Sequence, residues 1–430
     1  MDTLWNKSGK KLNDAIAQYT VGSDSVLDLQ LMPFDIMASI VHAKALYKTG
    51  VLSEVELDKI TSSLNTLGEQ VKAGHITLGL DSEDCHTLIE NYLTHKLGDL
   101  GKKIHAGRSR NDQVLVALRL YMKNELVFLN EQCINVAEAF LCFSEKYKHI
   151  PMPGYSHTKQ AMLTTVGHYF GSFVESLLDD ADFLTAIFRH IDKNPLGSAA
   201  GFGTTAQIDR NYTTTELGFN SIQINSLYCQ NSRGKFESLF LEGLLQIMLT
   251  LGRFASDLII FTSDEFDYFS VDDSLVTGSS IMPHKRNLDV MEILRGNVAI
   301  VSANQQAIQN ISRNLMSGYH RDLQLIKKPL FESVEIVKLS LEVSKIMIDG
   351  IAPNQDKIAS KIEGGIFSAD YAHELVKTRG IPFRDAYKFA VSGEYSPRDL
   401  LGNVKSKTTI GAPGNPGFEI YWERINRMRE

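Results

Sequence analysis

Two serines, a lysine and an asparagine lie close together in the segment GSSIMPHKRN, residues 278–287. Gly278 allows backbone angles that point successive N–H groups at one spot, an arrangement that binds an anion such as a carboxylate. Lys285 adds a full positive charge. Neither Ser279 nor Ser280 lies in a G-x-S-x-G nucleophile elbow, so a hydrolase is not indicated. The segment predicts an anion-binding loop, with a solvated loop and a stray lysine as the open alternative.

A second candidate is His157, in the glycine-containing segment PMPGYSH, residues 151–157. Imidazole is the side chain best suited to move protons near neutral pH. A lone histidine is more often structural. Glu292, in the helix expected after the serine loop, can accept a proton from such an imidazole and fix its tautomer. The sequence by itself does not establish that contact.

A third candidate is the segment HAGRSRNDQV, which places two arginines at the start of a predicted long helix. Helix N-termini bind anions, and arginine recognises carboxylates through two parallel hydrogen bonds. A capped helix start with solvated charges explains Asn111 and Asp112 but leaves the paired Arg108 and Arg110 unexplained. Anion binding by this turn is therefore the stronger interpretation.

Long helices are the elements that must position these segments. None of the eleven prolines lies between Pro33 and Pro151 or between Pro195 and Pro283, which leaves room for uninterrupted helices. Strand-like alternation is scarce, so the sequence predicts a mainly α fold. Apolar residues recur at three- and four-residue steps, typical of amphipathic helices, over residues 111–147, 241–261 and 288–311. Loops between helices are expected at residues 151–157, 194–205 and 276–283.

The totals describe an ordinary globular chain. It has 430 residues, 43% hydrophobic and 22% charged, and a net charge of -7 that gives no sign of a nucleic-acid or membrane surface. Glu242, Arg253 and Asp257 interrupt the most apolar stretch and argue against a membrane span. The first twenty residues lack an apolar export signal, so a cytoplasmic location is expected. The four cysteines show no metal-binding spacing and are assigned no function.

The length favours more than one domain. We expect an N-terminal helical domain over residues 1–107, a central long-helix bundle over residues 108–350 and a small C-terminal domain over residues 351–430. The sequence changes character beyond Ile351, where TRGIPFRDAY and TTIGAPGNPGF follow.

Together, HAGRSRNDQV, PGYSH and GSSIMPHKRN resemble the three signature regions of the fumarase/aspartase superfamily. The GSSxMPxKxN pattern is shared across that superfamily, whereas GRSRNDQV is typical of the argininosuccinate lyase family. The similarity covers most of the chain and includes FTSDEF (261–266), YHRDLQ (319–324) and KTRGIPFRDAY (377–387).

This resemblance implies a mainly α, fumarase/aspartase-like fold with a long central helical bundle and smaller N- and C-terminal helical domains. It implies a homotetramer whose active sites collect loops from different subunits. The implied reaction is the reversible elimination of argininosuccinate to arginine and fumarate, a step of arginine biosynthesis, with no metal or organic cofactor.

The resemblance also assigns roles to residues. Ser279 is implied as the base, and Lys285 and Asn287 as groups that stabilise the dianionic aci-carboxylate formed when the proton leaves. His157, backed by Glu292, is implied to assist protonation of the leaving guanidino nitrogen, directly or through a water. The other implied substrate-binding residues are Ser109, Arg110, Asn111, Ser156, Tyr319, Gln324 and Lys327.

Several positions depart from the family pattern. Leu288 stands for a proline, Ser156 for a threonine, Lys159 for a glutamine and Leu163 for a proline. Arg233 lies in NSRGKFE, where the family has S-x-R-D-F, so its alignment stays open. Two alternatives also stay open: a related C–N lyase that releases fumarate from another N-substituted aspartate, and an inactive structural member of the family.

Overall fold

The structure is a computed structural model that describes residues 13–22, 24–76, 84–391, 393 and 399–430. Contacts within the chain divide it into two compact units, each assembled from separate stretches. Unit 1 comprises residues 1–128, 184–244 and 301–335, and unit 2 comprises residues 129–183, 245–300 and 336–430. The three-domain division expected from the sequence is not tested by these units and stays a prediction.

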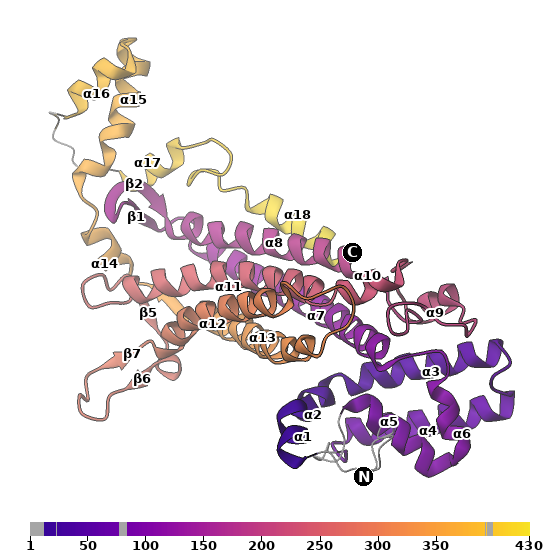
Figure 1. The fold of residues 1–430 in the computed structure, drawn as a ribbon. Coiled ribbons are helices and arrows are strands. Elements are labelled where there is room, and N and C mark those ends of the chain that lie inside the picture. The colour runs from indigo at the N-terminus through magenta and orange to yellow at the C-terminus, as the bar shows by residue number, and fades with distance from the viewer. Residues whose placement is uncertain (1–12, 23, 77–83, 392, 394–398) are drawn as a thin grey trace. The chain divides into compact units, whose positions relative to one another are not determined.

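Long helices dominate the chain, as the sequence predicts (Figure 1). The three periodic segments are confirmed as helices, and their bounds agree with the apolar pattern to within a few residues. The five longest helices are α7 (Arg110–Lys146), α8 (Val166–Ile191), α11 (Lys235–Phe261), α12 (Asp289–Ser312) and α13 (Lys327–Asp349).

By length and composition alone, α7 and α11 are apolar enough to cross a membrane. About half of each apolar window is buried inside the protein, 56% for α7 and 50% for α11. Core helices of soluble proteins pass the same test, so this finding is weak evidence for a membrane span.

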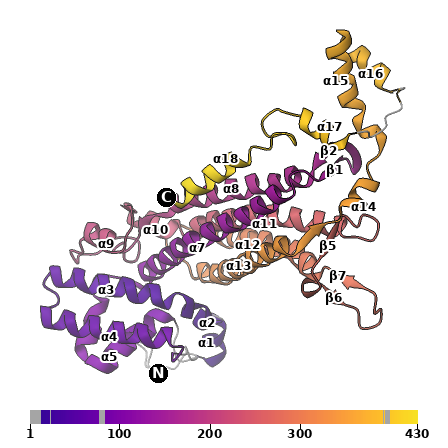
Figure 2. The same ribbon diagram turned by 180° about the vertical axis from the view of Figure 1, so that it is seen from behind.

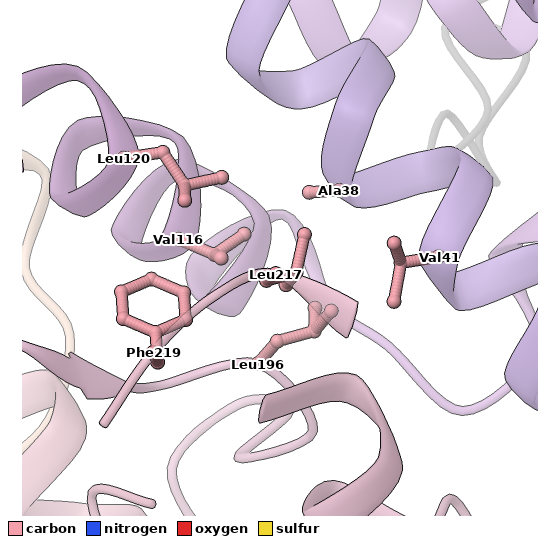
Figure 3. Packing of buried hydrophobic residues seen from close by; sticks show 7 residues of the cluster. All are labelled: Ala38, Val41, Val116, Leu120, Leu196, Leu217 and Phe219. Carbon is pink, nitrogen blue, oxygen red and sulfur yellow. The ribbon is translucent and has the colours of Figure 1, made fainter. Parts of the chain in front are cut away.

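Unit 1 contains a short-helix cluster together with parts of the long helices. Its core includes seven apolar residues from α3 (Met32–Lys48), from α7 and from the segments after α8. Figure 3 shows them: Ala38, Val41, Val116, Leu120, Leu196, Leu217 and Phe219. The spacing of three residues between Ala38 and Val41 puts both on one helix face. The unit's shorter helical elements are α1 (Asp14–Val21), α2 (Asp24–Leu27), η1 (Asp28–Gln30), α3 (Met32–Lys48), α4 (Glu54–Lys72), α5 (Cys85–Leu97), α6 (Asp99–Lys102), η2 (Lys103–His105), α9 (Arg210–Glu216), α10 (Ser226–Asn231) and η4 (Arg321–Ile326). Its strands are β3 (Lys193–Asn194) and β4 (Ser221–Ile222).

Unit 2 is held together by aromatic packing between helices. Phe140 of α7 lies edge-on to Phe254 of α11, with ring centroids 4.9 Å apart, and Phe170 and Phe173 of α8 complete the group. Aromatic pairs of this kind add about 0.5–1.5 kcal/mol beyond the area they bury. The unit's shorter elements are β1 (Pro151–Ser156), β2 (Lys159–Thr165), β5 (Phe269–Val271), η3 (Asp273–Leu275), β6 (Thr277–Gly278), β7 (Arg286–Asn287), β8 (Ile351–Pro353), α14 (Gln355–Ser360), η5 (Gly364–Phe367), α15 (Ser368–Arg379), α16 (Phe383–Val391), α17 (Leu400–Ser406) and α18 (Phe418–Arg429).

Two of the segments expected as loops are partly strands, and the expectation was wrong there. The first six residues of PMPGYSH form β1, which pairs antiparallel with β2, and the serine segment begins in β6, which pairs with β7. Strands of two to seven residues carry too short an alternation to be recognised in sequence. Each of the four sheets in the described residues has only two strands.

Candidate functional site

A polar cavity of about 350 Å³ lies within unit 1. Its lining is mostly charged, with four cations, two carboxylates and one histidine. A mixed lining of this kind suits a ligand that carries several charges of both signs. The lining residues are Asp24, Asp84, His86, Arg110, Asn111, Val114, Arg233, Tyr319, Arg321, Gln324 and Lys327.

The start of α7 is capped by the side chains of Ser109 and Asp112, and Arg110 and Asn111 lie in the cavity wall. Ser109 Oγ accepts a hydrogen bond from the Asn111 N–H at 3.3 Å, and Asp112 Oδ1 accepts one from the Ser109 N–H at 2.8 Å. These bonds satisfy N–H groups that the first helical turn leaves without partners. Ser109 therefore caps the helix beside the cavity, and the expected turn is confirmed as a helix start.

Asp112 also anchors a second loop of unit 1. Its Oδ2 accepts hydrogen bonds from the N–H groups of Gly197, at 3.0 Å, and Ala199, at 2.9 Å. Asp112 is fully buried, and burial raises its pKa although the N–H donors oppose the shift. One carboxylate thus joins GRSRND to the glycine-rich loop, which explains Asp112 as a structural residue.

Lys327, the first residue of α13, is buried between two carboxylates. Its Nζ lies 2.6 Å from Asp28 Oδ1 and 2.8 Å from Asp24 Oδ2. Burial alone would lower the pKa of Lys327, but the charges of Asp28 and Asp24 outweigh it and raise the pKa. Arg233 also interacts with Lys327 and Asp24, so two cations and two carboxylates lie close together at this end of the cavity.

A second acidic group lies at the start of α5. Asp84 caps that helix by accepting the Thr87 N–H at 2.7 Å, and its Oδ2 lies 3.5 Å from Arg110 Nη1. His86 follows, with Nδ1 2.7 Å from Asp35 Oδ2. Burial alone would lower the pKa of His86, but Asp35 outweighs it and raises the pKa.

Arg233 is a buried cation of the cavity wall, and its charge interacts with those of Asp24 and Lys327. Its Nε has no hydrogen-bond partner, and its guanidinium lies 5.8 Å from the centre of the Tyr319 ring. A buried donor without a partner is costly. A carboxylate of a ligand would supply that partner, which makes Arg233 the clearest indication in this cavity of an anionic ligand.

The cavity brings together five of the residues implied by the resemblance: Arg110, Asn111, Tyr319, Gln324 and Lys327. Gln324 is held by hydrogen bonds from its Nε2 to the carbonyls of Thr20 and Val21, at 3.1 and 3.2 Å. Sequence reasoning missed Asp24, Asp84, His86 and Arg321, and it left Arg233 open. The phrase SEDCH carries two of the missed residues, but no spacing marks it as a site.

In unit 2, Ser156 and His157 lie at the end of the β1–β2 hairpin. Ser156 pairs with Lys159, so His157 and Thr158 form a two-residue turn, and both have positive φ, 52° and 62°. Such a turn favours Asn-Gly, and a β-branched residue there is strained. His157 is exposed at this tip.

Ser279 and Lys285 lie in the loop of the β6–β7 hairpin, which extends away from the long helices in both views (Figures 1 and 2). Ser279 Oγ accepts hydrogen bonds from the N–H groups of Ile281, at 3.3 Å, and Met282, at 3.1 Å. Lys285 is exposed, and Asn287 is partly buried in β7. The N–H groups that the sequence predicts around an anion are therefore present, and they bind the serine oxygen itself.

Glu292 lies in the first turn of α12 and is exposed. Leu288 precedes the helix, and its carbonyl accepts the Met291 N–H at 3.0 Å and the Glu292 N–H at 3.3 Å. Within the described part of unit 2, no hydrogen bond or ion pair joins His157 to Glu292, Ser279 or Lys285. A single chain thus presents these groups on separate exposed elements.

Comparisons with known proteins identify the family of the chain. A protein-family model described as Lyase matches residues 11–302. The argininosuccinate lyase of Thermotoga neapolitana is 43% identical over 90% of this chain and 97% of that protein. The argininosuccinate lyase of Xanthomonas campestris pv. campestris is 38% identical over 98% of this chain and 99% of that protein.

Solved structures share the fold. The structure titled EDDS lyase in complex with formate has a TM-score of 0.83 at 21% identity, over 98% of this chain and 92% of that one. The class II fumarase of Schistosoma mansoni has a TM-score of 0.73 at 16% identity, over 95% and 91%. These identities show the fold alone, whereas the full-length relatives decide the family. The chain belongs to the argininosuccinate lyase family, within the fumarase/aspartase superfamily.

Proposed function

We propose that this chain is a carbon–nitrogen lyase that splits argininosuccinate into arginine and fumarate, a reaction of arginine biosynthesis. The single structural observation that supports the proposal is buried Arg233, whose Nε has no hydrogen-bond partner among the described residues, in a cavity wall that also contains acidic groups. Argininosuccinate has three carboxylates, a guanidinium and an ammonium group. It therefore carries charges of both signs, as the lining does.

The cavity offers distinct partners for the two halves of that substrate. Arg110, Asn111 and Arg233 are suited to carboxylates, because guanidinium and N–H groups donate to them. Asp24 and Asp84, the two carboxylates of the lining, are suited to a cationic group. Tyr319 and Gln324 add neutral hydrogen-bonding groups.

In the proposed reaction Ser279 removes a proton from the succinyl carbon next to a carboxylate, and the C–N bond then breaks as the C=C bond of fumarate forms. A serine oxygen is a weak base. The N–H groups of Ile281 and Met282, which already donate to Ser279 Oγ, support it by stabilising an alkoxide. Lys285 and Asn287 stabilise the dianionic aci-carboxylate, and exclusion of water when the loop closes would strengthen both effects.

The leaving group is arginine, whose guanidino nitrogen needs a proton. His157 assists this protonation directly or through a water, and Glu292 fixes the histidine tautomer. Ser156 retains the hydroxyl of the family's threonine and binds a substrate carboxylate. His157 and Glu292 lie on separate elements of one chain. The roles proposed for them and for Ser156 therefore rest on the family motif and on the residue types.

We further propose a homotetramer in which sites are shared between subunits. Two observations support it: His157, Lys285 and Glu292 are exposed in one chain, and the long helices of unit 2 expose large apolar side chains. Exposed apolar surface of this kind marks association sites. The side chains are Leu249, Ile260, Ile293, Ile300, Leu339 and Ile346. A cytoplasmic enzyme with a small-molecule substrate, and without nucleic-acid or membrane partners, remains the expected setting.

The direct test is fumarate release, followed by ultraviolet absorbance, with argininosuccinate and with other N-substituted aspartates. The proposal expects argininosuccinate to have the highest kcat/KM. A higher value for another N-substituted aspartate would reassign the substrate within the same chemistry. Absence of turnover with all of them, in a folded protein, would indicate an inactive structural member.

Sharing of the site is tested by mixing two inactive variants. His157→Asn and Ser279→Ala proteins are unfolded together in equal amounts and refolded. If the two residues of one site come from different subunits, about one quarter of the sites should regain both intact groups in a symmetric oligomer. If both came from one chain, every site would keep one defect and recovery would stay near zero although mixed oligomers had formed.

A further inference from the structure

Three residues of unit 1 form a compact cluster that the proposed reaction does not use. Asp35 of α3 and the first two residues of α5, Cys85 and His86, are all buried. One ligand atom from each lies within 4.8 Å of the other two. Carboxylate oxygen, thiolate sulfur and imidazole nitrogen together form a donor set typical of zinc-type transition metals.

The distances between the donor atoms match such an ion. His86 Nδ1 lies 2.7 Å from Asp35 Oδ2, and Cys85 Sγ lies 3.7 Å from Nδ1 and 3.8 Å from Oδ2. The centre of this triangle is about 2.0 Å from each atom, close to zinc bond lengths of about 2.0–2.3 Å. A small widening of the Asp35–His86 pair would bring all three bonds into range.

Asp35 and His86 are each more than nine-tenths buried, and each keeps one polar atom, Oδ1 and Nε2, without a hydrogen-bond partner. The protein alone therefore leaves these two side chains incompletely satisfied. His86 also borders the cavity, which offers a path for an ion and a water as a fourth ligand.

The surroundings favour a cation. Asp28 accepts the Cys85 N–H at 3.2 Å, and Asp84 immediately precedes the cysteine. These carboxylates would stabilise a divalent cation, and that cation would stabilise the thiolate of Cys85.

We propose that Asp35, Cys85 and His86 bind a zinc-type divalent ion through Oδ2, Sγ and Nδ1, in the wall of the cavity. On binding, the thiol releases its proton, Nδ1 gives up the proton it shares with Asp35, and the remaining imidazole proton is on Nε2. No electron is transferred. No step of the proposed elimination is routed through this ion, although His86 also lines the substrate cavity.

Titration of the untagged, full-length protein with Co²⁺ tests the site, because a cobalt–thiolate bond gives a near-ultraviolet charge-transfer band. We expect one Co²⁺ per chain, with visible bands of four-coordinate cobalt, and displacement by Zn²⁺. Cys85→Ala should remove the charge-transfer band. Asp35→Asn keeps the thiol and should weaken binding by about tenfold or more.

Cys142→Ala is the matched control, because Cys142 is an exposed cysteine outside the cluster. It should keep the full cobalt spectrum. Circular dichroism of metal-free protein checks that each variant is folded, and Cys85→Val replaces Cys85→Ala should the smaller side chain not be tolerated. A featureless wild-type titration, or a band that survives in the Cys85 variants and disappears in Cys142→Ala, would overturn the proposal.

Discussion

The cavity of unit 1 and the two hairpins of unit 2 hold their candidate functional residues in different ways. In the cavity, Lys327 is buried between two carboxylates and Arg110 follows a capped helix start, so binding groups are held in place within one chain. In unit 2, His157 and Lys285 lie on exposed hairpin tips. The binding residues are therefore held in place by local packing. The proposed proton-transfer residues are exposed, and in the proposed shared site another subunit would cover them.

This difference has a physical basis. Buried charges need fixed partners, because an unpaired one is costly, and fixed partners make a rigid wall. A serine base needs a loop that can close over the substrate and exclude water, and hairpin tips can move. If this contrast is correct, substitutions in the hairpins of unit 2 should abolish catalysis and leave substrate binding intact. Substitutions of the buried charged groups of unit 1 should lower the free energy of unfolding.

The largest effect is expected from Ser279→Ala. Loss of the proposed base should reduce kcat by about 10³-fold or more, while argininosuccinate still binds, because the unit 1 cavity is unchanged. Fumarate release and calorimetric binding measure the two effects. Ser280→Ala, one residue along the same loop, is the control and should keep most activity. A greater loss in the control would move the base to Ser280.

A large loss of stability is expected from Asp28→Ala. The change removes one of the two partners of buried Lys327 and the acceptor of the Cys85 N–H. Breaking a buried ion pair typically costs about 3–5 kcal/mol. Urea unfolding measures the loss. Asp99→Ala breaks an exposed pair with Lys102 and should change stability little, so equal effects would refute the contrast between buried and exposed pairs.

A smaller, pH-dependent effect is expected from Asp180→Asn inside unit 2. Burial raises the pKa of Asp180 to about 6 from its ordinary 3.8, and Thr250 donates a hydrogen bond to it. Between these values the folded chain binds more protons than the unfolded chain, so stability falls as pH rises from about 4 to about 6. The amide avoids this loss and should stabilise the protein above pH 6 by about 3 kcal/mol.

Urea unfolding at several pH values checks the Asp180 prediction. The difference between variant and wild type should vanish below about pH 4 and grow to a plateau above about pH 6. Asp264→Asn, at an exposed position of the same unit, should show no such pH dependence. A constant difference at all pH values would mean that packing rather than ionisation causes it.

The smallest effect is expected from Thr158→Gly at the β1–β2 tip. Thr158 has a φ of 62°, which glycine adopts without strain, so the change should stabilise the hairpin by about 1 kcal/mol. Turnover should persist because His157 keeps its place. Thr164→Gly, inside β2, should destabilise instead, and thermal unfolding compares the two. Stabilisation by both would show that the turn conformation is not the cause.

Much of the fold could be predicted from the sequence. The long helices follow from apolar spacing and from the placement of prolines, because both act locally along the chain. The two hairpins were missed, since their strands are short and their pairing depends on residues across the turn. The start of α12 was expected at Leu288 and lies one residue later, with Leu288 as the cap.

The candidate site, like the fold, could be predicted only in part from the sequence. The family motifs predict which loops carry chemistry, and Arg110, Asn111, Tyr319, Gln324 and Lys327 do line one cavity. The sequence could not decide the unsatisfied Nε of Arg233 or the meeting of Asp35 with Cys85 and His86, which lie about fifty residues away along the chain. Residue types and local spacing can be read directly from the sequence. Burial and pairing between distant residues exist only once the chain has folded, because both depend on which side chains exclude water together.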